Sequence, residues 1–85
     1  MNYDEMMHKL VAHYKEEIEG VHEYARLAEE AEETGDYALA RCLCKIAKQE
    51  YAHADALRKH LIEDYEYDPH ADHETEKKWK DIKKL

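Results

Sequence analysis

Residues that interrupt helices are nearly absent from this chain. Its 85 residues include two glycines, Gly20 and Gly35, and one proline, Pro69. Much of the remainder is alanine, glutamate, lysine and leucine, which all favour helices. Because the chain has so few turn signals, the sequence predicts an all-α fold.

Two long helices are predicted, the first over about residues 3–33 and the second over about residues 37–65. Asn2 is placed to cap the start of the first helix. Gly35 suits the left-handed position after its end, and Asp36 suits the N-cap of the next helix. A turn this short makes the two helices antiparallel, so the sequence predicts a helical hairpin.

A third, shorter helix is predicted over about residues 73–84, with Asp72 as its cap and Pro69 after the end of the second helix. Its apolar residues share one face at a spacing of three: Trp79, Ile82 and Leu85. We therefore expect residues 1–67 to form the hairpin, and residues 68–85 to form a short C-terminal helix that docks on it through Trp79.

Each long helix carries an apolar seam with alternating spacings of three and four, the pattern of helices that pack in bundles. The first seam consists of Met7, Leu10, Tyr14, Glu17, Val21, Tyr24, Ala28 and Ala31. The second seam consists of Ala40, Leu43, Ala47, Glu50, Ala54, Leu57 and Leu61. Further apolar residues flank both seams, and a hairpin alone cannot bury faces of this width. We therefore predict that two chains form a homodimer with a four-helix bundle, or a higher homo-oligomer.

Each seam contains one carboxylate, Glu17 in the first helix and Glu50 in the second. These two residues are about equally distant from the turn, so an antiparallel hairpin places them at nearly the same height. His53 follows Glu50 by three residues and shares its helical face. Carboxylates buried together without cations would repel each other and lose hydration at large cost. Oxygen and nitrogen ligands together suit a first-row metal such as iron, manganese or zinc.

The stretches EEIEGVHEYARLAEEA (residues 16–31) and IAKQEYAHADAL (residues 46–57) resemble ferritin-like and rubrerythrin-like half-bundles, and encapsulated ferritins most of all. Those proteins pair short chains of two long helices and build a di-iron centre across the interface. Glu17 matches the first-helix ligand of that family, and Tyr24 matches its tyrosine beside the metal. Glu50 and His53 match its Glu-x-x-His motif.

The resemblance implies a ferroxidase-type oxidoreductase that oxidises Fe²⁺ with O₂ or H₂O₂, in iron storage or detoxification. It makes Glu17 and His53 terminal ligands and Glu50 a bridge between two irons. It also makes Tyr24 a hydrogen-bond partner of a ligand, and it raises an encapsulin shell as a partner. Two alternatives stay open: a non-redox dimer that holds zinc or manganese in the same ligands, and a structural helical protein without metal.

The charge of the chain limits its partners. The formal net charge of −8 argues against nucleic acid and anionic membranes as partners. No apolar run is long enough to span a bilayer, and MNYDEMMHKL lacks the pattern of a signal peptide. We therefore expect a cytoplasmic protein, which the resemblance would place inside a protein nanocompartment.

Several smaller features have structural interpretations. Gly20 in mid-helix costs about 1 kcal/mol of helix stability relative to alanine. A glycine at such a position is expected where a neighbouring helix approaches closely. Cys42 and Cys44 are two residues apart on a helix, so they cannot pair with each other and are expected to be small buried residues. Surface or rim positions are expected for the following histidines: His13, His22 and His60. A solvated cap is expected for a short cluster after the second helix: His70, Asp72 and His73.

Overall fold

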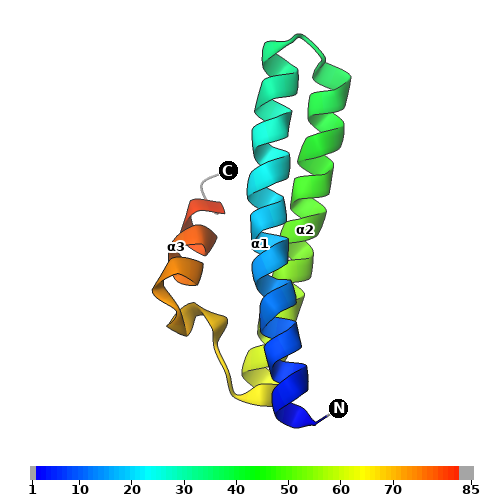
Figure 1. Ribbon diagram of the computed structural model, residues 1–85. Helices are drawn as coiled ribbons and strands as arrows, with labels where there is room; N and C mark the ends of the chain where they lie inside the picture. The colour runs from blue at the N-terminus through cyan, green and yellow to red at the C-terminus, as the bar shows by residue number, and fades with distance from the viewer. Residues whose placement is uncertain (1, 83–85) are drawn as a thin grey trace.

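The computed structural model describes residues 2–82, which contain three α-helices, one short 3₁₀ helix and no strand. Helix α1 spans Tyr3–Glu33, α2 spans Tyr37–Tyr65, η1 spans Pro69–Ala71 and α3 spans His73–Ile82. Helices α1 and α2 form an antiparallel hairpin, and α3 lies beside it (Figure 1). The all-α prediction and the bounds of both long helices are confirmed. Leu85 and the predicted last turn of the third helix lie outside the described residues.

The ends of the hairpin helices are capped as the sequence predicts. Oδ1 of Asn2 accepts a hydrogen bond from the backbone N–H of Glu5 at 2.9 Å, which satisfies a donor in the first turn of α1. Gly35 has a φ of 86°, a left-handed conformation that glycine adopts without a steric penalty. Oδ1 of Asp36 accepts a hydrogen bond from the backbone N–H of Leu39 at 3.1 Å and so caps α2.

Helix α2 ends in a left-handed residue that no glycine signals in the sequence. Glu66 follows the helix with a φ of 52°. The backbone N–H groups of Glu66 and Tyr67 both donate to the carbonyl oxygen of Leu61, the latter at 3.0 Å, and so satisfy this acceptor in the last turns of the helix. Pro69 then begins η1, so the proline follows the end of the helix rather than breaking it.

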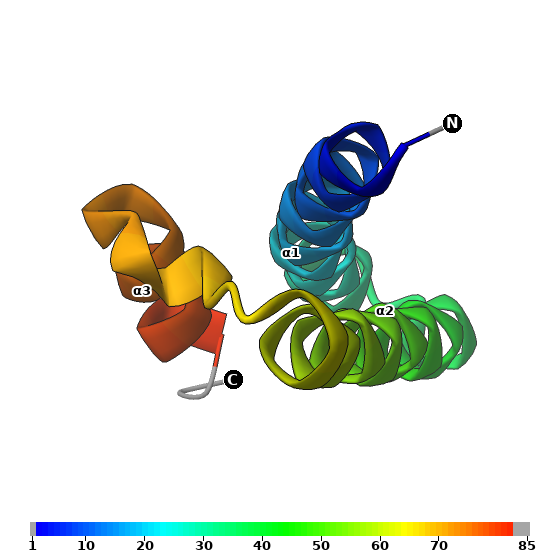
Figure 2. The same ribbon diagram turned by 90° about the horizontal axis from the view of Figure 1, so that it is seen from below.

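Helix α3 docks on the hairpin through Trp79, as predicted. The Trp79 side chain is only 5% exposed, and its ring stacks on that of Tyr51 with the centroids 4.9 Å apart. The guanidinium carbon of Arg58 lies 5.9 Å from the centroid of the same ring. Ile82 is buried beside it, and Figure 2 shows that α3 covers only one side of the hairpin.

His70 is not part of a solvated cap, and the prediction for it was wrong. Its Nε2 atom lies 2.5 Å from the hydroxyl oxygen of Tyr14, and its ring centroid lies 5.3 Å from that of Trp79. Tyr14 is fully buried, and a buried tyrosine hydroxyl needs a hydrogen-bond partner. Burial raises the pKa of Tyr14, so the hydroxyl stays protonated in this contact. His70 therefore helps to hold η1 and α3 against α1.

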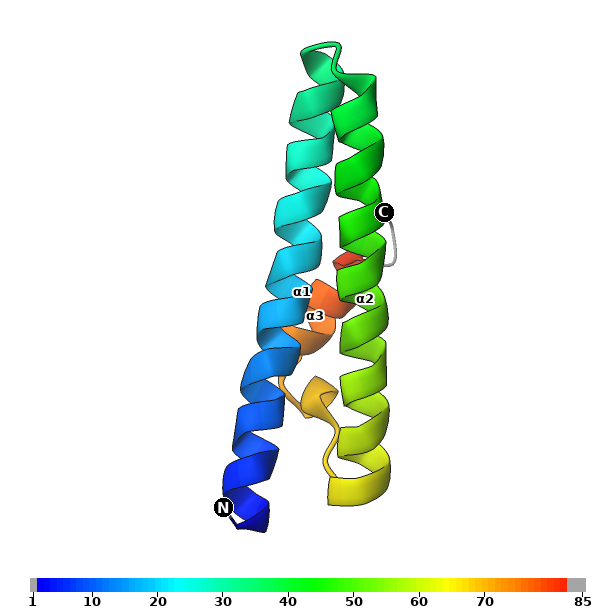
Figure 3. The ribbon, with the colours of Figure 1, turned by 90° about the vertical axis from the view of Figure 1, so that its right-hand side faces the viewer.

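The hairpin has a covered face and an open face. The core lies on the covered side, between the hairpin and α3. It consists of Tyr14, Ile18, Val21, Ala47, Ala54 and Leu61 from the hairpin, and Trp79 and Ile82 from α3. Figure 3 looks onto the opposite side, where α1 and α2 run next to each other and α3 lies behind them. None of the described helices is long and apolar enough to cross a membrane.

The predicted seams divide between these two faces. Tyr14, Val21 and Ala54 turn toward α3 and are buried, whereas Glu17 and Glu50 are only half-buried. Residues spaced by three and four along a helix share one face, and on the face that carries Glu17 and Glu50 several apolar side chains are exposed. These side chains, with their exposed fractions, are Met6 (38%), Leu27 (46%) and Leu39 (45%). One chain thus buries only one face of its hairpin, and dimerisation stays a prediction.

Candidate metal centre

Three of the four predicted site residues come together in the structure. Glu17 extends from α1, and Glu50 and His53 extend from α2. Each offers one ligand atom, and these atoms all lie within 4.8 Å of one another. Within residues 2–82 this is the only group of three or more His, Cys, Asp or Glu side chains with that geometry. The antiparallel hairpin therefore produces the convergence that equal distance from the turn predicted.

The Glu17 carboxylate is held in an unfavourable environment. Its Oε2 atom is buried and has no hydrogen-bond partner among the described residues. The nearest cationic candidate is Nδ1 of His53, which lies 3.6 Å from that oxygen. The His53 side chain is 62% exposed, whereas that of Glu17 is 24% exposed. A buried carboxylate oxygen without a donor is destabilising, and a bound cation would supply the missing interaction.

Gly20 explains how the Glu50 carboxylate fits between the helices. A Cβ atom at Gly20 would lie 3.1 Å from Oε2 of Glu50, which is tighter than nine in ten contacts of a Cβ atom. The sequence predicted the close approach of a neighbouring helix at Gly20, whereas the group that lies there is the Glu50 side chain of α2. The glycine leaves room for the carboxylate at the price of about 1 kcal/mol of helix propensity.

The two carboxylates change each other's ionisation. The pKa of Glu50 is raised above its ordinary value, chiefly because the adjacent Glu17 carboxyl favours the protonated, hydrogen-bonding form of Glu50. Loss of hydration and repulsion by the Glu17 charge raise this pKa further, and the nearby His53 opposes the shift. Two carboxylates and an imidazole in this arrangement are chemically suited to a divalent first-row metal ion, which would compete with protons for the carboxylates.

Tyr24, the fourth predicted site residue, is not one of the His, Cys, Asp or Glu side chains that define this group. Tyr24 lies seven residues after Glu17 on α1, is half-buried, and packs against the edge of the core. Its predicted role beside the metal therefore stays a prediction.

Two histidines that sequence reasoning placed at the surface lie next to the ligand group. His13 and His60 are exposed, as predicted, and both line a shallow pocket on the open face. The complete lining is Leu10, His13, Glu17, His53, Ala56, Leu57 and His60. The spacing of four between His13 and Glu17, and of seven between His53 and His60, is the sequence signal that could have indicated this shared face.

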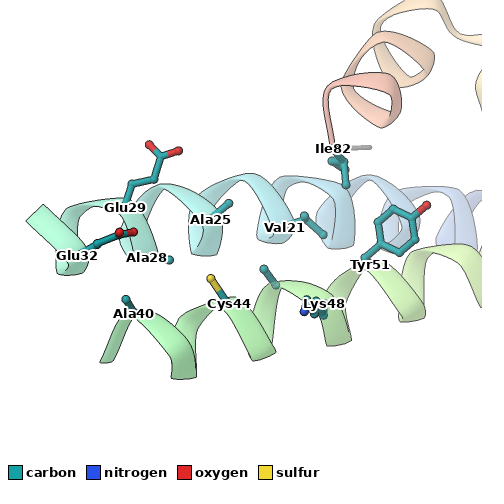
Figure 4. Close-up of a pocket in the computed structure, with 11 residues that line it drawn as sticks. Val21, Ala25, Ala28, Glu29, Glu32, Ala40, Cys44, Lys48, Tyr51 and Ile82 are labelled. Carbon is teal, nitrogen blue, oxygen red and sulfur yellow. The ribbon is translucent and has the colours of Figure 1, made fainter. Parts of the chain in front are cut away.

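A larger groove runs between α1 and α2 on the turn side of α3 (Figure 4). Its volume is about 580 Å³, and small apolar residues such as Ala25, Ala28 and Ala40 form much of its lining. Cys44 also lines this groove, and both Cys42 and Cys44 are exposed. The prediction that the two cysteines are buried was wrong, because the chain has no element that covers this part of the hairpin within residues 2–82.

Comparison of the chain with protein-family models, with curated proteins and with solved structures finds no match.

Proposed function

We propose that this protein is a ferritin-like half-bundle, and that two copies pair across the open face to hold two metal ions. The observation that carries this proposal is the convergence of Glu17, Glu50 and His53 within 4.8 Å, with Oε2 of Glu17 buried and unpartnered. A cation provides the interaction that this oxygen lacks in the single chain.

The ligand group of one chain supports the pairing of two. One chain offers three ligand atoms, whereas first-row ions commonly take about four to six. A second copy would add an equal set, and the four carboxylates would neutralise two divalent ions. The same pairing would cover the exposed Met6, Leu27 and Leu39 side chains, which a stable monomer would leave in water.

The proposed activity is the oxidation of Fe²⁺, which is the substrate, by O₂ or H₂O₂. With O₂, two Fe²⁺ ions give up two electrons, and two protons are taken up to form H₂O₂ and two Fe³⁺ ions. Glu17 and His53 would hold the ions at their outer sides, and Glu50 would lie between them. The Tyr24 hydroxyl is proposed to hydrogen-bond to a ligand. Carboxylate oxygens favour the more highly charged product, because they are hard, anionic ligands.

A non-redox dimer that holds zinc or manganese is the second candidate. It is supported by the same mixture of oxygen and nitrogen ligands, which suits these two metals as well as iron. In that case the ions would bind at Glu17, Glu50 and His53 without turnover.

An aerobic Fe²⁺ titration of metal-free protein tests the proposal. We expect the absorbance of oxidised iron to rise faster than in buffer, with a break near one iron per chain. Light scattering should give at least twice the chain mass of 10.2 kDa. Glu50→Gln should lose both the break and the acceleration, whereas Glu63→Gln, a matched change at an exposed position of α2, should keep them.

Different failures would remove different parts of the proposal. If wild type shows neither a break nor acceleration but binds Zn²⁺ at one ion per chain, the non-redox candidate replaces the ferroxidase. A monomer at micromolar concentration would contradict the paired site.

A further inference from the structure

Two imidazoles outside the ligand group share a pocket with it. His13 of α1 and His60 of α2 line the same open pocket as Glu17 and His53, with a volume of about 420 Å³. The other lining residues are apolar, so the three imidazoles and one carboxylate are the polar groups of this pocket. An ion in the pocket would meet nitrogen ligands on its way to the Glu17 carboxylate.

Each of these two histidines has a carboxylate at its Nδ1 atom. Nδ1 of His60 lies 2.8 Å from Oδ2 of Asp64, and Nδ1 of His13 lies 3.5 Å from Oε2 of Glu16. The contact of His60 is a hydrogen bond, which holds the imidazole hydrogen on Nδ1 and leaves the lone pair on Nε2, whereas the carboxylate of Glu16 lies near Nδ1 of His13 at a longer distance. This tautomer ligates metals through Nε2, and the carboxylate makes the ring a stronger ligand.

In the single chain both imidazoles are open to ions from solution. The side chains of His60 and His13 are 70% and 67% exposed, respectively. The carboxylates beside them, together with Glu17, also make the local potential negative, which raises the local concentration of cations.

We propose that His13 and His60 provide a second binding position for divalent transition-metal ions, which receives ions before they reach the main ligand group. Imidazole nitrogen selects ions such as Zn²⁺, Fe²⁺ and Co²⁺ over Mg²⁺ and Ca²⁺. The delivery role rests on the proposed function, but the binding of metal by these histidines does not. In the proposed dimer the pocket lies on the face through which the chains pair, so ions would reach these histidines before the second chain covers that face.

Zinc alone is the probe for this position. Metal-free protein at pH 8 is titrated with Zn²⁺ by calorimetry and followed by ¹⁵N NMR of the histidine side chains. We expect a class of zinc sites weaker than the main group, and shifts of the Nε2 resonances of His13 and His60. The double variant His13→Asn/His60→Asn should weaken this class at least tenfold and slow Fe²⁺ loading several-fold. His8→Asn, which removes an exposed imidazole of α1 outside the pocket, should change neither.

A second variant tests the carboxylate pairs without removing an imidazole. Glu16→Gln/Asp64→Asn should weaken zinc binding at the histidines about tenfold, because the Nδ1 partners are lost. If this variant and His13→Asn/His60→Asn both bind zinc as wild type does, and the two Nε2 resonances do not shift, the inference is wrong.

Failure of the inference and failure of the proposed function are distinguishable. Glu50→Gln removes a ligand of the main group but leaves His13 and His60 intact, so the Nε2 shifts should persist in this variant. If Glu50→Gln leaves iron oxidation unchanged, the proposed function is wrong, whereas the histidine position is still supported by its shifts. If the shifts disappear in Glu50→Gln, the histidines do not bind zinc independently and the inference is overturned.

Discussion

Replacing Glu50 with glutamine should stabilise the metal-free protein, although it removes a proposed ligand. The ligand atoms of Glu50 and Glu17 lie within 4.8 Å of each other. At 4.8 Å two unit charges repel by about 0.9 kcal/mol in bulk water, and by about 3.5 kcal/mol at an effective dielectric constant of about 20. Because both side chains are partly exposed and can share a proton, we expect a gain near the lower limit, about 1 kcal/mol.

The gain in stability from Glu50→Gln should increase with pH, because the pKa of Glu50 is raised in the folded chain. That pKa is raised in the folded chain, so the folded state binds the proton more tightly than the unfolded state does. The unfavourable contribution of Glu50 is therefore absent below its ordinary pKa of 4.5 and complete above the raised value. Glu50→Gln should gain about 1 kcal/mol at pH 7 and almost nothing below about pH 4.

Chemical unfolding of metal-free protein at pH 7 and pH 4 measures this effect directly. The same experiment at pH 7 with excess Zn²⁺ should reverse the order of stability, because wild type gains the binding free energy and Glu50→Gln does not. Protein concentration must be held constant, since unfolding of an oligomer depends on it. Glu63→Gln serves as the control for loss of one negative charge on α2.

A destabilised Glu50→Gln variant at pH 7 would refute this reasoning. That result would show that Glu50 makes a favourable contact in the metal-free protein and that repulsion by Glu17 is not the dominant interaction. An equal gain at both pH values would also count against it, because a charge effect must disappear where both carboxyl groups are protonated.

Two further predictions concern the packing around the site. Trp79→Ala should lower the free energy of unfolding by about 3–5 kcal/mol, because it removes a buried aromatic side chain that holds α3, and urea unfolding against a Trp79→Phe control would measure it. A loss below about 1 kcal/mol would show that α3 contributes little to stability. Gly20→Ala should raise the melting temperature through helix propensity but weaken Zn²⁺ binding, because the new Cβ displaces the Glu50 carboxylate. Unchanged Zn²⁺ affinity in a stabilised Gly20→Ala protein would contradict the positioning role of the glycine.

The hairpin was predictable because its determinants are local. The stop at Gly35 and the restart at Asp36 are encoded within a few residues, and the cap at Asn2 needs only its own turn. The convergence of Glu17 with Glu50 follows from the same turn, because an antiparallel hairpin fixes which residues lie at equal heights. His53 then follows from the helical repeat.

The contacts of His70 and the exposure of Cys44 depend on tertiary structure and were not predictable. His70 meets Tyr14 across 56 residues of sequence, and no spacing rule connects a residue of a short turn with a position on α1. The period of the seams shows that each helix has an apolar stripe, but it does not show which side of the stripe α3 covers. Tyr14 therefore lies under α3, whereas Glu17, one turn away, lies at the edge of the open face.

Two unfavourable features of the chain coincide at one contact. Gly20 weakens α1, and the Glu17–Glu50 pair brings like charges together on a face that leucine would fill with a gain in stability. Departures from the most stable choice are expected where a protein binds something, since selection there acts on affinity as well as on stability. A cation would relieve the repulsion and satisfy Oε2 of Glu17, while Gly20 keeps the Glu50 carboxylate in reach. A single binding event thus accounts for both features, whereas a purely structural role for this face accounts for neither.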